Sequence, residues 1–186
     1  NIYRALLYDN AQERWLAYED PVDVLMTTDP AKVLEVMSQI ERRVEAQGLI
    51  AVGFVTYEAA AGFDSALTTH GAAELPLVCF ALFRSFDVVA APSVGSAVSG
   101  QPWRCSESAE NYRQAIAHIR ELIGAGSVYQ INHTTRLRGL VNDPKTLFAE
   151  VAAGAPHAAY LECDSHVIVS ASPECFFSID GERIFS

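Results

Sequence analysis

The hexapeptide Ser170-Ala171-Ser172-Pro173-Glu174-Cys175 carries more structural information than any other stretch of this 186-residue chain. It places the carboxylate of Glu174 directly after a proline and just before the aromatic pair Phe176-Phe177. A carboxylate against aromatic neighbours loses hydration, which disfavours ionisation and is one way to make a general acid or base. An exposed turn glutamate is the simpler alternative, and the residues alone favour it.

A second polar segment, Tyr129-Gln130-Ile131-Asn132-His133-Thr134, lies upstream within a predicted strand at 127–137. Side chains alternate between the two faces of a strand, so one face would carry Gln130, Asn132, Thr134 and Arg136. Neutral amides and hydroxyls in a row suit a partly buried site that binds its ligand through hydrogen bonds. An edge strand facing water would be equally polar, so the spacing leaves both interpretations open. Three of the five histidines, His118, His133 and His166, have no spacing that pairs them, and a structural or exposed role is expected for each.

The remaining sequence predicts an α+β fold, mostly antiparallel sheet with inserted helices. Three helices are expected to start at capping positions, namely Asp29-Pro30, Ser108 and Asp143-Pro144, and glycines 48, 124 and 126 end the first two. Apolar runs predict strands at 2–8, 14–18, 49–57, 77–89, 127–137, 157–163 and 166–171, followed by a hairpin at 176–185. Its turn, Asp180-Gly181, has the composition of type I′. Because hairpins dominate, a parallel doubly wound sheet is disfavoured.

The segment 90–101 is rich in Ala, Ser, Gly and Pro without periodicity, which predicts a linker. It divides the chain into an N-terminal subdomain, residues 1–101, and a second region, residues 102–186.

The composition is that of a globular protein and argues against several partners. Half of the residues are apolar, and 13 basic against 23 acidic residues give a net charge of −10, so nucleic-acid binding is not expected. No apolar run is long enough to span a membrane, and no signal-peptide pattern is found at the start. The four cysteines show no metal-ligand spacing. A cytoplasmic protein without disulfides and without metal ligands in this chain is therefore expected.

Four segments in order resemble the chorismate-utilising enzymes, particularly the aminodeoxychorismate synthase component I branch of that family. In the first two, a helix ends in glycine and enters a Tyr-Gln-x-Asn strand, and Ser-Pro-Glu is followed by two phenylalanines. These two segments are 119–134 and 172–177. The other two lie upstream, at 53–60 and 76–80. The resemblance therefore extends over nearly the whole chain, and it implies the N-terminal part of an anthranilate synthase component I-like fold.

The resemblance also implies a reaction. Ammonia replaces the 4-hydroxyl of chorismate, giving 4-amino-4-deoxychorismate for p-aminobenzoate and folate synthesis. A glutamine amidotransferase subunit would supply the ammonia, and Mg2+ would bind the substrate carboxylate through ligands expected outside this chain. Glu174 is implied as the acid/base carboxylate, with Gln130, Asn132 and Thr134 positioning substrate or nucleophile. Gln130 stands where water-using relatives carry lysine, and an amide cannot deprotonate water, so ammonia is favoured as the nucleophile.

Two other functions remain open. One is anthranilate synthase component I. By the resemblance, one position carries Lys in aminodeoxychorismate synthases and Ala in anthranilate synthases, and it is expected beyond Ser186 with the rest of the catalytic half. This chain alone is therefore expected to be inactive. The third possibility is a non-catalytic module for amino-acid sensing or partner docking. Many relatives hold tryptophan in an N-terminal pocket, and the residues at the corresponding places are Asp9, Asn10, Pro156 and His157. A simple core hairpin is the alternative interpretation of these four residues.

Overall fold

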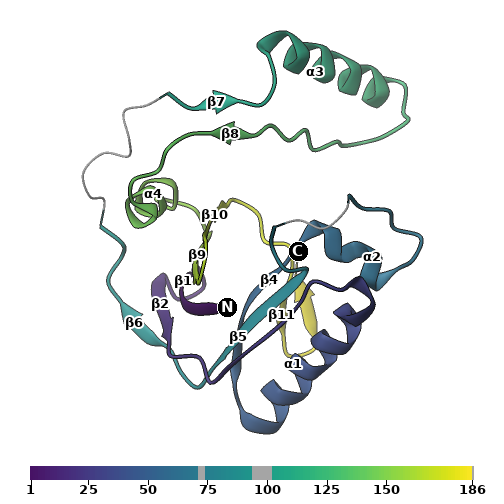
Figure 1. Cartoon of the computed structure of the whole chain (residues 1–186). Coiled ribbons are helices and arrows are strands. Elements are labelled where there is room, and N and C mark those ends of the chain that lie inside the picture. Colours follow the sequence, from purple (N-terminus) through teal and green to yellow (C-terminus); the bar gives the residue numbers. More distant parts are fainter. Residues whose placement is uncertain (71–73, 94–101, 186) are drawn as a thin grey trace. The chain divides into compact units, whose positions relative to one another are not determined.

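The computed structural model describes residues 1–70, 74–93 and 102–185. The chain forms two compact units, one made of Asn1–Val94 with Pro144–Ser186 and one made of Gly95–Asp143 (Figure 1). Helices occur together with antiparallel sheets, so the predicted α+β class is confirmed. Of the predicted linker at 90–101, residues 94–101 lie outside the described residues.

The larger unit contains two main sheets, and all their strand pairs are antiparallel. The five-stranded sheet has the order β10 (Val167–Ser172), β9 (His157–Cys163), β1 (Ile2–Asp9), β2 (Arg14–Glu19) and β6 (Asp87–Val89). The three-stranded sheet has the order β3 (Asp23–Thr27), β5 (Val78–Phe83) and β4 (Ile50–Val55). Strands β1 and β9 come from opposite sides of the predicted boundary after residue 101, and that boundary stays a prediction.

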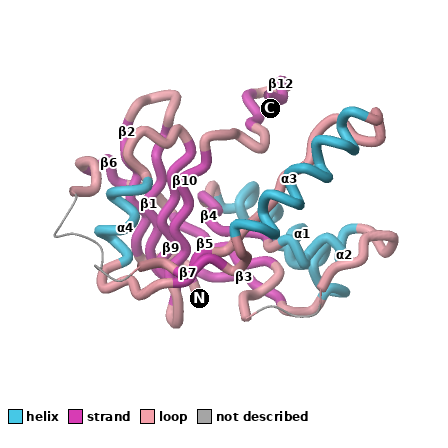
Figure 2. The backbone as a smooth tube through the Cα atoms, turned by 90° about the horizontal axis from the view of Figure 1, so that it is seen from above, coloured by secondary structure: helices cyan, strands magenta, loops and turns pink. Residues whose placement is uncertain are grey.

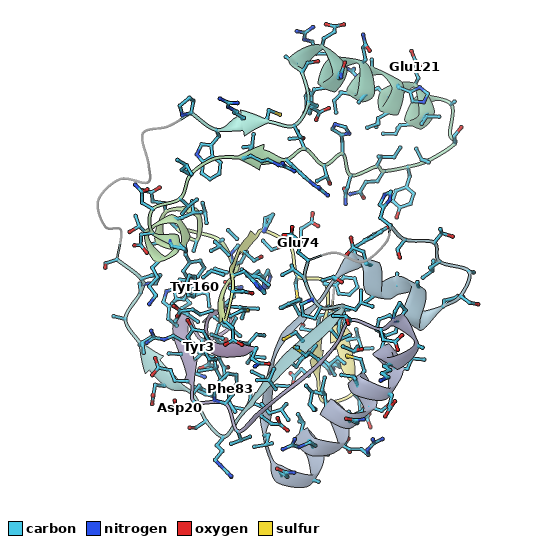
Figure 3. All side chains as sticks on the ribbon, in the orientation of Figure 1. Tyr3, Asp20, Glu74, Phe83, Glu121 and Tyr160 are labelled. Carbon is cyan, nitrogen blue, oxygen red and sulfur yellow. The ribbon has the colours of Figure 1, made fainter. Side chains whose placement is uncertain are left out.

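The two sheets pack face to face around the main core. Alternate residues of β1, Ala5 and Leu7, lie in this core, and a register shift between Ile2 and Arg4 turns Ile2 to the same side. From the other sheet come the buried side chains of Val52, Cys79, Ala81 and Phe83, the last labelled in Figure 3. Because the core needs both sheets, neither sheet would retain its buried face alone.

Helix α1 (Val33–Gln47) covers the outer face of the three-stranded sheet. It follows a 3-10 turn, η1 (Pro30–Lys32), in which the Asp29 side chain accepts a hydrogen bond from the Ala31 N–H at 3.0 Å. Gly48 ends the helix in the left-handed region with φ 61°, as predicted. The alternate residues Val78 and Leu82 of β5 pack under α1, so β5 is buried on both faces. The short η2 (Tyr57–Ala59) and α2 (Ala60–Phe63) follow β4.

Helix α4 (Pro144–Val151) covers the opposite face of the five-stranded sheet, beside β1 and β9 in Figure 2. Its Phe148 is 1% exposed and meets the rings of Trp15 and Tyr160 at centroid distances of 5.5 and 5.4 Å. The larger unit is thus built in four layers, in the order α1, three-stranded sheet, five-stranded sheet and α4.

The smaller unit contains β7 (Arg104–Cys105), α3 (Ala109–Gly124) and β8 (Leu137–Arg138), and β7 pairs with β8. Ser108 caps α3 by accepting a hydrogen bond from the Asn111 N–H at 3.1 Å, which confirms the predicted start of this helix. No residue of α3 is buried in the described part of the chain.

Three strand predictions are wrong in detail. The run 77–89 forms two strands, β5 and β6, which belong to different sheets. The run 127–137 forms a strand only from Leu137, because the short β7 is the partner that pairs with it. In the hairpin of β11 (Ser178–Asp180) and β12 (Arg183–Phe185) the turn residues are 181 and 182, one position later than predicted. Gly181 has φ 59° and Glu182 has no positive φ, which excludes type I′.

The central position of Phe148 predicts a large effect of its truncation. Phe148→Ala should lower the free energy of unfolding of the larger unit by about 3–5 kcal/mol, because it removes a buried ring and leaves a cavity. Urea denaturation measures this difference. The matched control is Phe176→Ala, at a side chain that is 90% exposed, and a change of less than about 0.5 kcal/mol is expected there. Equal losses in both variants would contradict the proposed layer order.

Candidate functional site

The side chains predicted to position the substrate belong to the segment 127–136 of the smaller unit. This segment forms neither helix nor strand. Gln130, Asn132 and Thr134 are all exposed. The side-chain amide of Gln130 donates to Oδ1 of Asn132 at 3.5 Å, so these two polar groups lie together. Their common face was predicted from the alternation of side chains along a strand, and this segment is not a strand. The Gln130–Asn132 contact brings two of the three side chains together instead.

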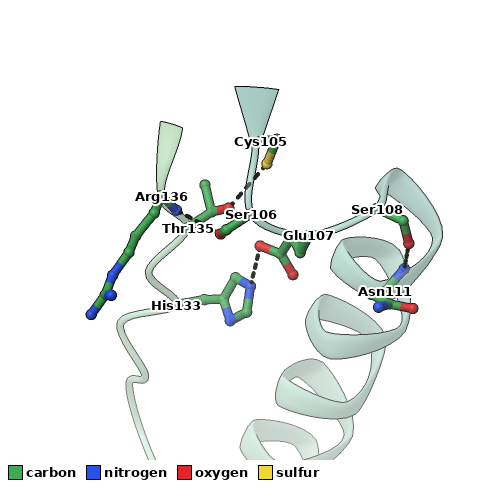
Figure 4. Close-up of polar contacts among 8 residues, drawn as sticks. All are labelled: Cys105, Ser106, Glu107, Ser108, Asn111, His133, Thr135 and Arg136. Carbon is green, nitrogen blue, oxygen red and sulfur yellow. Dashed lines mark hydrogen bonds and ion pairs between the residues drawn. The ribbon is translucent and has the colours of Figure 1, made fainter. Parts of the chain in front are cut away.

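Contacts with the chain before α3 hold this segment in place, as Figure 4 shows. Nε2 of His133 lies 3.1 Å from Oε1 of Glu107. The backbone N–H of Arg136 donates to Oγ of Ser106 at 3.0 Å, and the Ser106 N–H donates to the Arg136 carbonyl at 2.7 Å. The sequence suggested a structural role for His133, and the structure supplies its partner, Glu107. No spacing rule pairs two residues 26 positions apart.

Glu174 lies in the larger unit, directly after β10, and its side chain is exposed. Its backbone is held in a tight turn, in which Oγ of Ser172 donates to the Glu174 carbonyl at 2.8 Å and lies 3.3 Å from the Glu174 N–H. The rings of Phe176 and Phe177 contact each other at a tilt of 60° with centroids 5.1 Å apart, and Phe176 is 90% exposed. Glu174 is therefore an exposed turn residue, the alternative that the residues alone favoured, and it is not buried against these rings.

A pocket of about 410 Å3 opens at the Tyr8 end of the five-stranded sheet. Two of the four residues predicted for an amino-acid pocket, Asn10 and Pro156, line it together with Tyr8 and Trp15. Further lining comes from residues 91 and 92 and from 149 and 152–155 around the end of α4. This volume lies within the range of small-molecule sites.

The other two predicted pocket residues lie elsewhere. The Asp9 carboxylate accepts from Nε of Arg14 at 3.1 Å and from the Gln12 N–H at 3.3 Å, which ties the turn between β1 and β2. His157 is half-buried at the start of β9 and is not among the lining residues. Asp9 therefore stabilises the turn that contains Asn10 and does not line the pocket itself.

A second hollow of about 370 Å3 lies along the same face of the sheet, at the Arg4 end. Its lining includes the cations Arg4 and Lys145 and the phenol of Tyr160. Arg4 pairs with Glu19, and Nζ of Lys145 lies 3.8 Å from a carboxylate oxygen of Glu162. Both positive charges therefore have carboxylate partners.

Within residues 1–70, 74–93 and 102–185, no group of three or more His, Cys, Asp or Glu side chains could hold a metal ion. No helix in the same residues is long and apolar enough to cross a membrane.

Comparison with known proteins places both polar segments in one family region. Residues 90–186 match the family described as chorismate binding enzyme, and this range includes Gln130 and Glu174. Over 81 residues, 41% of the chain, the sequence is 35% identical to anthranilate synthase component 1 of Haloferax volcanii. The matched stretch covers 15% of that protein, so the chain corresponds to a small part of its relative. No solved structure matches the chain.

The cysteines differ in environment, which predicts different reactivities. Hydrogen bonds from the Thr135 hydroxyl, 3.2 Å away, and from backbone N–H groups lower the pKa of the exposed Cys105 thiol. Burial raises the pKa of Cys79 and Cys163. Iodoacetamide should therefore alkylate Cys105 in the native protein and spare the two buried thiols.

Thr135→Val removes the hydroxyl with little change in shape, so it should raise the pH midpoint of Cys105 alkylation. Mass spectrometry of peptides quenched at each pH measures the midpoint. The midpoint of Cys175, in the larger unit, serves as the internal control. An unchanged Cys105 midpoint would show that the Thr135 hydroxyl does not stabilise the thiolate.

Proposed function

This chain belongs to the family of chorismate-binding enzymes, and on that premise we propose that it is part of an aminodeoxychorismate synthase component I. The complete protein would convert chorismate and ammonia to 4-amino-4-deoxychorismate, the precursor of p-aminobenzoate in folate synthesis. The observation that carries the ammonia-using chemistry of this proposal is Gln130, an amide within the family region, on a segment whose polar side chains are exposed. An amide cannot deprotonate water, so it suits a site whose nucleophile is ammonia.

The proposal gives each polar segment a task. Glu174 would protonate the departing hydroxyl, and its exposed side chain is accessible to a substrate. The Gln130 and Asn132 amides, in contact at 3.5 Å, would donate hydrogen bonds to substrate or nucleophile, and Thr134 would add a hydroxyl. A glutamine amidotransferase subunit would supply ammonia. Mg2+, with ligands outside this chain, would neutralise a carboxylate of the substrate.

Anthranilate synthase component I is the second candidate, favoured by the identity with the Haloferax volcanii protein. Both candidates add ammonia to chorismate, so both need the residues named above. They differ in product, since one releases 4-amino-4-deoxychorismate and the other releases anthranilate.

The proposal predicts the effect of changing Glu174 in the complete protein. Glu174→Gln keeps the size of the side chain and removes the acid, so kcat for chorismate consumption should fall by about 10²–10⁴-fold. The assay contains chorismate, ammonium chloride and Mg2+, with product separation by liquid chromatography. Glu182→Gln, an exposed position in the β11–β12 turn, should leave the rate within about twofold.

Two outcomes would contradict the proposal. A near-normal rate for Glu174→Gln, with circular dichroism like that of the wild type, would overturn its acid/base role. Anthranilate as the product of the wild-type protein would replace the first candidate by the second.

An amino-acid-sensing role is supported by a separate observation, the pocket lined by Asn10 and Pro156. If the pocket binds tryptophan, isothermal titration of this chain should show saturable binding. Asn10→Ala should weaken it by about tenfold, the loss of one hydrogen bond to a charged ligand group. Gln47→Ala, at the exposed end of α1, is the control and should bind as the wild type does. Equal affinity of the Asn10 and Gln47 variants would remove Asn10 from the site.

A further inference from the structure

We infer that His133, fixed by Glu107 and Tyr112, is a positioning residue that holds Gln130, Asn132 and Thr134 in the arrangement that receives the substrate. His133, Glu107 and Tyr112 together form the His133 clamp. The consequence for catalysis rests on the function proposed above, whereas the consequence for the order of the segment does not.

The segment needs a clamp because regular structure does not hold it. Residues 127–136 have no strand partner, and β8 begins only at Leu137. The Gln130 and Asn132 side chains bond to each other and are exposed. A free segment of this length samples many conformations, and binding a substrate would carry the entropic cost of ordering it.

The two ends of the segment are tied by backbone hydrogen bonds. At its start, the Ser127 N–H donates to the carbonyl of Leu122 at 3.0 Å in the last turn of α3. At its end, Arg136 and Ser106 exchange two hydrogen bonds, of 3.0 and 2.7 Å. Among described residues 128–134, His133 is the one with a hydrogen bond to a residue outside the segment.

The clamp holds His133 from two directions. Nε2 lies 3.1 Å from Oε1 of Glu107, and the imidazole ring lies 5.6 Å from the Tyr112 ring. The His133 and Glu107 side chains are only 25% and 20% exposed. Partial burial strengthens such a pair, since less water competes for it.

The same unit contains a matched pair without these features. His118 and Glu121 on α3 lie 3.6 Å apart, with side chains 69% and 78% exposed. An exposed pair of this kind contributes little. His133 stands between Asn132 and Thr134, so a fixed His133 side chain restrains the backbone of both neighbours. His118 is flanked by no residue predicted to bind the substrate.

The first arm of the test measures order in the 186-residue chain by NMR relaxation. In Glu107→Gln and His133→Phe, backbone order parameters for residues 130–134 should fall below about 0.6, from about 0.8 in the wild type. The amide of Arg136 should exchange about fivefold faster, because the loosened segment opens more often. His118→Phe and Glu121→Gln should change neither quantity. Unchanged order in the Glu107 and His133 variants would overturn the clamp.

The second arm uses the complete protein and separates positioning from general damage. His133→Ala should raise KM for chorismate by about tenfold with kcat within about twofold, because a loosened binding group weakens ground and transition states alike. His133→Lys keeps a hydrogen-bond donor for Glu107 and should restore most of the affinity, which a purely structural defect would not allow. Loss of order without any change in KM would overturn the positioning role.

The two arms also separate this inference from the proposed function. If the wild-type protein consumes no chorismate, the proposed function fails, while the order parameters still decide whether the clamp exists. If His133→Ala does not fold, Glu107→Gln, which conserves size, gives the same measurements, and a KM like that of Glu121→Gln would refute the inference.

Discussion

The face-to-face packing of β1 against β5, between the two main sheets, is the contact on which the larger unit depends. β5 is buried on both faces, and β1 is buried toward the shared core and half-buried on the α4 side, so each strand takes part in two cores. Ala5 and Leu7 of β1 point to the shared core, while Leu6 and Tyr8 point to the α4 side. A slip of one residue in β1 would exchange these sets, so the burial pattern specifies the register.

The two polar segments have different mechanical support. Glu174 follows β10, a strand of the five-stranded sheet, and a Ser172 turn holds its backbone. Gln130 lies on an irregular segment that side-chain contacts hold. Sheets open only with much of the unit, whereas irregular segments open locally.

Local signals explain why much of the fold was predictable. The Asp29 and Ser108 caps and the left-handed Gly48 depend on residues within one helical turn, and all three occur where expected. The candidate site was only partly predictable, for the opposite reason. Asn10 and Pro156 line one pocket, yet Asp9 turns to Arg14, and Glu174 is exposed, without the burial that an acid against aromatic rings would have. The exposure of Glu174 depends on which parts of the folded unit pack near it, whereas Asp9 takes a partner only five positions away, Arg14.

Residue order alone was sufficient for the helix ends, most strands and the polar character of the two family segments, because periodicity and capping act over a few residues. Residue order alone did not determine which strands and side chains pair when they are far apart in the sequence. The structure divides 77–89 between two sheets, limits the strand at 127–137 to its last residue, and joins His133 to Glu107. A strand exists only where another backbone satisfies its hydrogen bonds, and that backbone is chosen by the packing of the whole unit.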